Sequence, residues 1–154
     1  MRALLVVLIA GCVVQSTTRS DDPGGWILPG GTTQGHCQSD GACRTGEVCA
    51  RNGACLPSSL VHPVHVTWTL RGMPASRTTC EAALDLEIGF YDKANPGASG
   101  LGYAPVPCIE GKFTVDKLPT SYTGVKLGRD SGDHTWEWAM IDGTTGDAAL
   151  DLPF

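Results

Sequence analysis

Four evenly spaced cysteines constrain this chain more than any other feature of its sequence. Cys37, Cys43, Cys49 and Cys55 stand six positions apart, with glycine-containing turn sequences between them. A segment this short cannot bury a self-sufficient core, so it needs cross-links between its cysteines. Disulfide bonds and a zinc ion are the two chemistries that supply them. Structural zinc sites usually pair their cysteines at closer spacings, so we expect disulfides.

The amino-terminal sequence is typical of a signal for export. Arg2 is followed by nine residues, from Ala3 to Gly11, that carry no polar side chain. This pattern predicts a signal peptide over residues 1–11. It is shorter than the roughly 20 apolar residues of a membrane-spanning helix, and no comparable run follows.

The leader ends in Ile9-Ala10-Gly11-Cys12, which resembles the lipobox of bacterial lipoproteins. The resemblance implies that Cys12 is lipidated, with a diacylglycerol and an amide-linked fatty acid such as palmitate, and that the membrane is a partner through this anchor. Val13 occupies the position where some members carry an inner-membrane retention Asp. We therefore expect an exported protein on the outer membrane, at its periplasmic face or the cell surface. The alternative is an ordinary leader, cut elsewhere, that removes Cys12 or leaves it as a spare thiol.

The odd number of cysteines agrees with lipidation of one of them. Of seven cysteines, lipidation of Cys12 leaves an even number that could form three disulfides outside the cytosol: Cys37, Cys43, Cys49, Cys55, Cys80 and Cys108. The first four of these allow three pairings, and their spacing does not choose among them. Residues 37–55 resemble the amino-terminal cysteine-rich repeat of Dickkopf proteins, which implies a module and no activity. With that resemblance we expect the first cysteine to pair with the third and the second with the fourth.

The remaining chain divides into three parts by composition. Residues 12–35 are rich in small and polar side chains and predict a flexible tether behind the lipidated cysteine. Within it, Trp26 and its two apolar neighbours either pack on the folded domain or bind a partner or the membrane. Residues 36–57 form the cysteine-rich segment, and residues 62–154 form a larger domain.

The larger domain alternates apolar and polar side chains, as half-buried strands do. Every second residue is apolar from 64 to 70 and again from 84 to 90, and shorter alternating stretches follow. About seven short strands predict a mainly β protein whose two sheets pack as a Greek-key sandwich. Pro105 and Pro107 place their strand at a sheet edge. A capping-box pattern at residues 78–81 predicts one helical turn, which a Cys80–Cys108 disulfide would tie to that edge.

Residues 111–125 add a second resemblance. Their Gly-x-Phe-x-Val-x-x-Leu-Pro-x-x-Tyr pattern is similar to transthyretin-like, carboxypeptidase-regulatory-like and collagen-adhesin B-type sandwiches. The resemblance implies that Phe113 and Leu118 are core residues, that Pro119 shapes a turn and that Tyr122 starts the returning strand. It implies no enzymatic activity.

The candidate functional residues are few. Trp136 and Trp138 lie on one side of a predicted strand, which indicates core packing or an aromatic platform for a sugar or peptide. With a net charge of −5 and no basic cluster, nucleic acid is excluded as a partner. We find no catalytic, cofactor-binding or metal-binding motif and expect a non-catalytic binding or structural module at the envelope, with an envelope protein or polysaccharide as partner. The alternative is a metal-binding protein or metal-dependent hydrolase that uses His65, His134 and Asp133.

Overall fold

The protein is mainly β. A computed structural model describes residues 36–81, 85–92, 94, 100–129 and 135–154; the predicted signal peptide, Cys12 and the tether lie outside these residues. Within the described ranges there is no α-helix, and hence none long and apolar enough to cross a membrane. The strands are β1 Glu47–Cys49, β2 Cys55–Pro57, β3 Val61–Leu70, β4 Met73–Pro74, β5 Asp85–Tyr91, β6 Leu101–Pro107, β7 Lys112–Pro119, β8 Gly124–Gly128, β9 Trp136–Met140 and β10 Asp147–Leu152. Three short 3-10 helices are η1 Asp40–Ala42, η2 Ser58–Leu60 and η3 Cys108–Glu110.

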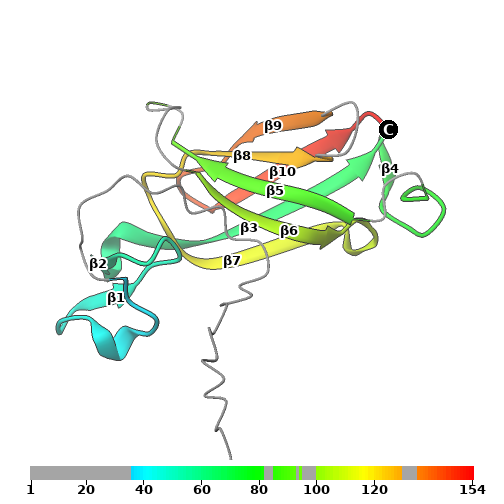
Figure 1. Cartoon of the computed structure of the whole chain (residues 1–154). Helices are drawn as coiled ribbons and strands as arrows, with labels where there is room; N and C mark the ends of the chain where they lie inside the picture. The colour runs from blue at the N-terminus through cyan, green and yellow to red at the C-terminus, as the bar shows by residue number, and fades with distance from the viewer. Residues whose placement is uncertain (1–35, 82–84, 93, 95–99, 130–134) are drawn as a thin grey trace, which may run out of the picture.

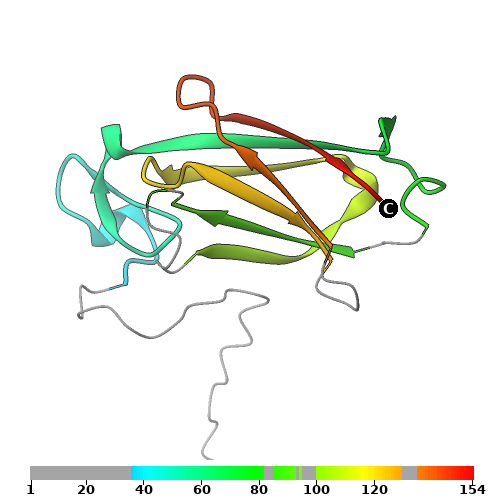
Figure 2. The same ribbon diagram turned by 90° about the horizontal axis from the view of Figure 1, so that it is seen from above.

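Two sheets form a sandwich (Figures 1 and 2). One is antiparallel with the order β6-β5-β8-β9. The other is built around β3, which pairs in parallel with β10 and antiparallel with β7 and β4. Since β10 pairs along the same β3 residues as β7 and β4, it lies on the opposite side of β3 from both. The predicted class, a small disulfide-rich segment followed by a mainly β sandwich, is confirmed.

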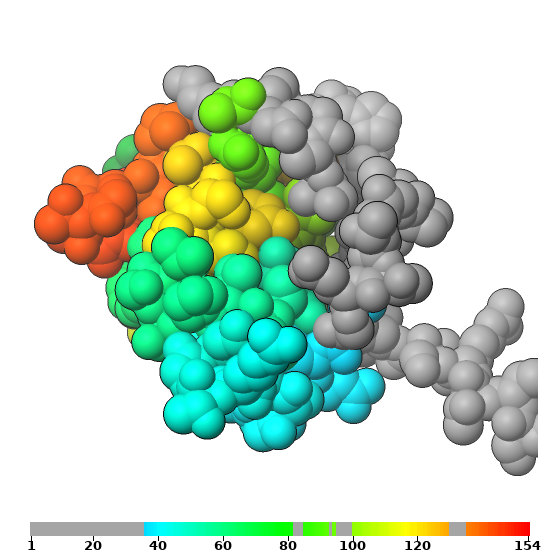
Figure 3. All heavy atoms as spheres, turned by 90° about the vertical axis from the view of Figure 1, so that its left-hand side faces the viewer, coloured from blue at the N-terminus to red at the C-terminus, as the bar shows by residue number. Residues whose placement is uncertain are grey.

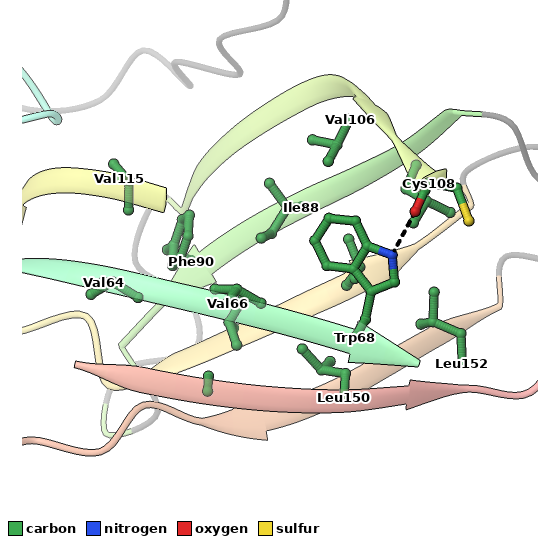
Figure 4. Close-up of a cluster of buried hydrophobic side chains, with 14 of the residues drawn as sticks. Val64, Val66, Trp68, Ile88, Phe90, Val106, Cys108, Val115, Leu150 and Leu152 are labelled. Carbon is green, nitrogen blue, oxygen red and sulfur yellow. Dashed lines mark hydrogen bonds between the residues drawn. The ribbon is translucent and has the colours of Figure 1, made fainter. Parts of the chain in front are cut away.

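The core lies between the two sheets and follows the alternation of the sequence. In β3 the side chains at positions 64, 66, 68 and 70 are all buried, and in β5 those at 86, 88 and 90 are. Figure 4 shows side chains from the two sheets facing one another, among them Val66 and Trp68 of β3 and Ile88 and Phe90 of β5. Trp68 brings a polar group into this core, and its indole Nε1 donates a hydrogen bond to the carbonyl oxygen of Cys108 at 2.9 Å. Burying each large aliphatic side chain contributes about 1.5–3 kcal/mol.

The proline-bearing strand is an edge strand, as predicted. Among the described strands, β6 pairs with β5 alone. It is followed by the fully buried Cys108, which forms a disulfide with the equally buried Cys80. The predicted helical turn before Cys80 begins two residues earlier than expected. The Ser76 and Thr79 side chains each accept a hydrogen bond from the other's main-chain N–H, at 3.2 and 2.8 Å, and the N–H of Cys80 donates to the carbonyl of Ser76. Ser76 caps the turn because its hydroxyl accepts from the N–H three residues later, that of Thr79. The capping-box pattern assigned this contact to Thr78 and the N–H of residue 81.

The cysteine-rich segment contains both predicted disulfides in the expected order. Cys37 pairs with Cys49 and Cys43 with Cys55, around the antiparallel β1–β2 hairpin. The segment lies at one end of the sandwich, whereas Phe154 lies at the other (Figures 1 and 2). Figure 3 views the first end, where the cyan segment borders the green stretch of the sandwich.

Two ion pairs join the cysteine-rich segment to β7, and the segment supplies the cation in one and the carboxylate in the other. Arg51 of the segment pairs with Asp116, and Lys117 of β7 pairs with Asp40, its Nζ lying 2.8 Å from Oδ2. The N–H of Arg51 also donates to the carbonyl of Lys117 at 3.1 Å. Lys117 adopts a positive φ of 50° where the β3–β7 register shifts, so a β-bulge turns this stretch toward the segment. Hydrogen bonds from Lys117 and from the N–H of Cys49 hold the pKa of Asp40 below its usual value.

Candidate functional site

The outer face of β8 and β9 carries the most exposed aromatic side chain of the described residues. In β8 the side chains of Val125 and Leu127 are fully buried, so Lys126 between them points outward. The ladder places Lys126 opposite Trp138, and paired residues share a face. We call the group on this face the aromatic surface, and it consists of Tyr91, Lys126, Trp136, Trp138 and Met140.

Of the two alternatives for Trp136 and Trp138, core packing is wrong, because neither side chain belongs to the buried core. Trp138 is 57% exposed and Met140 is 48% exposed, while Trp136 is partly exposed. The physical reason is the register with β8, which turns the side chain of Ala139 inward against the core. The side chains of β9 do alternate, but the larger ones lie on the face that is turned toward solvent.

Aromatic and cationic contacts hold the aromatic surface together. The rings of Tyr91 and Trp138 meet edge to face, with centroids 5.0 Å apart and planes at 80°. The Nζ of Lys126 lies 4.2 Å from the ring centroid of Trp136 and 5.8 Å from that of Trp138. These are the distances of a cation–π interaction, which at an exposed site is worth about 0.5–1 kcal/mol.

Glycines form the floor on which these side chains lie. Gly124 stands opposite Tyr91, and a Cβ there would lie 2.4 Å from the Tyr91 ring. Gly89 stands opposite Lys126, and a Cβ there would lie 2.8 Å from its Cε. Because both positions lack side chains, the Tyr91 ring and the Lys126 stem rest directly on the sheet.

The electrostatics of the surface leave the ammonium available to a ligand. In the part of the chain that the structure describes, no carboxylate forms an ion pair with Lys126. The phenol of Tyr91 is protonated at neutral pH, as tyrosine ordinarily is, and can donate a hydrogen bond; partial burial raises its pKa further. Glu87 lies on the same face, two positions before Gly89 in β5. The group therefore offers aromatic rings, one cation and hydrogen-bonding groups on a fixed sheet.

The other predicted site residues lie elsewhere. His65 is exposed on the outer face of the β3 sheet, where its Nδ1 lies 3.3 Å from the hydroxyl of Thr114. Asp133 and His134, with which it was grouped as a metal site, lie outside the described residues, as does Trp26. The grouping of His65 with Asp133 and His134 therefore stays a prediction.

The cysteine sulfurs also come close to one another. Those of Cys37, Cys43 and Cys55 lie within 4.8 Å. All three are oxidised in disulfides, and a metal would need them as thiolates. The geometry of this cluster is that of two adjacent disulfides.

Sequence reasoning named Trp136 and Trp138 but missed Tyr91 and Lys126 as their neighbours. The missing information is the cross-strand register, which residue spacing within a strand does not contain. One local signal was present: in Gly-Val-Lys-Leu-Gly, residues 124–128, glycines flank the single outward-pointing side chain. Glycine on the exposed face of a strand indicates that something approaches the backbone closely.

Comparisons with protein families, curated proteins and solved structures find no match to this chain.

Proposed function

We propose that this protein is an exported lipoprotein, anchored to the outer membrane by Cys12, that acts as a non-catalytic binding module at the cell envelope. The observation that carries the proposal is the complete pairing of six cysteines in three disulfides. Disulfides of this kind persist in oxidising compartments outside the cytosol. Each of the six has its partner, and the seventh cysteine of the sequence is Cys12, inside the lipobox-like run.

The binding part of the proposal rests on the aromatic surface. Its side chains are rings, one ammonium and a thioether, which bind ligands by stacking and charge. Within the described residues, this face holds no nucleophile placed beside a base. Exposing Trp138 to water forgoes burial of a large ring, and such exposed apolar groups mark interaction sites when they cluster.

The two resemblances belong to the same proposal. We propose a Dickkopf-like cysteine-rich repeat followed by a transthyretin-like sandwich. Supporting this, Leu118 is fully buried, Phe113 packs against the core and Pro119 ends β7. The pattern implies that Tyr122 starts the returning strand, whereas β8 begins two residues later, at Gly124.

Metabolic labelling tests the anchor. Cells expressing the full chain are fed an alkyne-tagged fatty acid, and membrane fractions are separated by density. Wild-type protein and a Val13→Ala control should carry the label in the outer-membrane fraction, whereas Cys12→Ser should lose the label and leave the membrane. Label that persists in Cys12→Ser would contradict the anchor.

Two further measurements test the compartment and the binding surface. Mass spectrometry after alkylation without reduction should find no free thiol among the six disulfide cysteines, and reduced cysteines would contradict the export. Envelope material bound by the wild-type chain should be lost on Trp138→Ala and retained on Met73→Ala, a control at a residue that is 51% exposed on β4. Equal retention by both variants would refute the aromatic surface as the binding site.

A further inference from the structure

We infer that the aromatic surface binds an acidic polysaccharide, with a sugar ring stacked on Trp138 and an anionic substituent of the sugar against the Nζ of Lys126. This inference rests on the proposed binding function and names its ligand. The alternative occupants, a protein or a neutral polysaccharide, are distinguished by the experiments below.

The size of the surface favours a sugar over a protein. A buried aromatic side chain covers about 150–250 Å², so Trp138, which has the largest aromatic side chain, offers up to roughly 140 Å² at 57% exposure. Met140, 48% exposed, and the partly exposed Trp136 bring the apolar area to about two or three hundred Å². A stable protein interface buries about 800 Å² on each partner. One or two stacked sugar rings need only the area of the rings themselves.

The rigidity of the surface suits stacking. Tyr91 holds Trp138 from the side by its edge-to-face contact, and the glycine at position 124 keeps the Tyr91 ring down on the sheet. The sheet ladder fixes the backbone beneath both rings. A ring that is already oriented loses little conformational entropy on binding, so more of the stacking energy appears as affinity.

The charge of the surface selects the acidic sugar. Lys126 places an ammonium between two indoles, and among the described residues no carboxylate pairs with it. An anionic group on the stacked sugar would provide that partner and a charge-assisted hydrogen bond. The chain has a net charge of −5, which opposes indiscriminate binding of polyanions. Binding of an acidic polysaccharide must therefore come from a local site.

Polar groups complete the site at its border. The protonated hydroxyl of Tyr91 can donate to a sugar oxygen, and the carboxylate of Glu87 on the same face can accept from sugar hydroxyls. Sugars carry both kinds of group around an apolar ring face. The arrangement of rings in the middle and hydrogen-bonding groups beside them matches that chemistry.

Affinity electrophoresis of the full chain in mild detergent tests the inference. The gels contain polygalacturonate, alginate or hyaluronate, each compared with its methyl-esterified form, which keeps the ring and removes the charge. The retardation gives a Kd for each polymer. We expect the Kd of the wild type for one or more acidic polymers to be at least tenfold lower than its Kd for the matched ester. No retardation by any acidic polymer, or equal retardation by acid and ester, would overturn the inference.

Variants test the two named contacts. Trp138→Ala should weaken binding at least tenfold, and Lys126→Met, which keeps the stem and removes the charge, should abolish the preference for acid over ester. Lys126→Arg should retain that preference, and the matched controls Met73→Ala and Lys112→Met should bind as the wild type does. Unchanged binding in Trp138→Ala or an unchanged preference in Lys126→Met would refute the assignment. Equal unfolding midpoints confirm that each variant is folded.

The outcomes separate this inference from the proposed function. If Trp138→Ala loses envelope material but no acidic polymer binds the wild type, the binding function stands and the polysaccharide is wrong. The same holds if the envelope material proves to be a protein. If Trp138→Ala retains the envelope material, the proposed binding function itself fails.

Discussion

Removing the buried disulfide of the sandwich should cost more stability than removing either disulfide of the cysteine-rich segment. Cys80 and Cys108 are both fully buried, and they tie the turn after β4 to the end of the edge strand β6. The double variant Cys80→Ala/Cys108→Ala breaks this link without burying a new polar group. Serine would add a buried hydroxyl and confuse the measurement.

The expected loss follows from the length of the closed loop. The two cysteines are 28 positions apart, so the loop contains 29 residues counting both. In the chain-entropy model this cross-link stabilises the folded state by about 3.6 kcal/mol at 25 °C. The control Cys43→Ala/Cys55→Ala opens a loop with a separation of 12, for which the same model predicts about 2.9 kcal/mol.

Urea unfolding without reductant measures both losses, because the remaining disulfides stay intact. With an m-value of about 1.5 kcal/mol/M, the sandwich variant should lose about 2.4 M in its midpoint. The m-value should also rise, since the unfolded chain expands once the link is removed. A loss below about 1.5 kcal/mol, or one smaller than in the control, would refute the loop-entropy reasoning.

Three further predictions concern single residues. Trp68→Phe should lower the free energy of unfolding by about 1–3 kcal/mol in urea, because the smaller ring leaves a void in the core and the Cys108 carbonyl loses the indole donor, although it retains the N–H of Gly111 at 3.2 Å; a loss below 0.5 kcal/mol, within about the scatter of surface substitutions, would contradict this. Gly146→Ala should lower the melting temperature by several degrees in calorimetry, since φ is +77° and the new Cβ would lie 2.2 Å from the carbonyl oxygen of Pro63; an unchanged melting temperature would show that this close approach is relieved at no cost. The folded-state pKa of Asp40 is lowered, so its contribution to stability is present above the unfolded value of about 3.9 and lost as the pH falls through the folded value. Asp40→Asn should accordingly melt below the wild type at pH 7, and the difference should shrink as the pH is lowered through the acidic range. A difference that does not change with pH would exclude the ionised carboxylate as its cause.

The fold could be predicted from the sequence where one periodicity decides the outcome. The alternation from Val64 to Leu70 defines a buried face because one side of the strand is apolar throughout. The prolines at 105 and 107 could be assigned to an edge because their missing N–H groups exclude a central ladder. The turn before Cys80 was misplaced by two residues because several hydroxyl side chains there compete to cap it.

The candidate site could be predicted only in part. Trp138 was identified as a binding candidate, but its exposure depends on which face β8 presents at Lys126. Pairing with β8 decides which face of β9 is buried. The sequence of β9 alone does not show this, because both of its faces carry apolar side chains, large on one and small on the other. Tyr91 joins the site through a strand 35 positions earlier in the sequence than Lys126, and no local pattern connects the two.

The parallel pairing of β10 with β3 makes the sandwich depend on two segments that lie far apart in the sequence. Residues Asp147 to Leu152 of β10 align with His65 to Leu70 of β3, and the paired residues Thr69 and Asp151 are 82 positions apart. Until β10 is in place, one flank of β3 has unpaired main-chain groups. Pairing across such a separation carries a large loop-closure cost and is slow compared with the formation of a hairpin. We therefore expect the docking of β10 on β3 to limit the rate at which the sandwich folds.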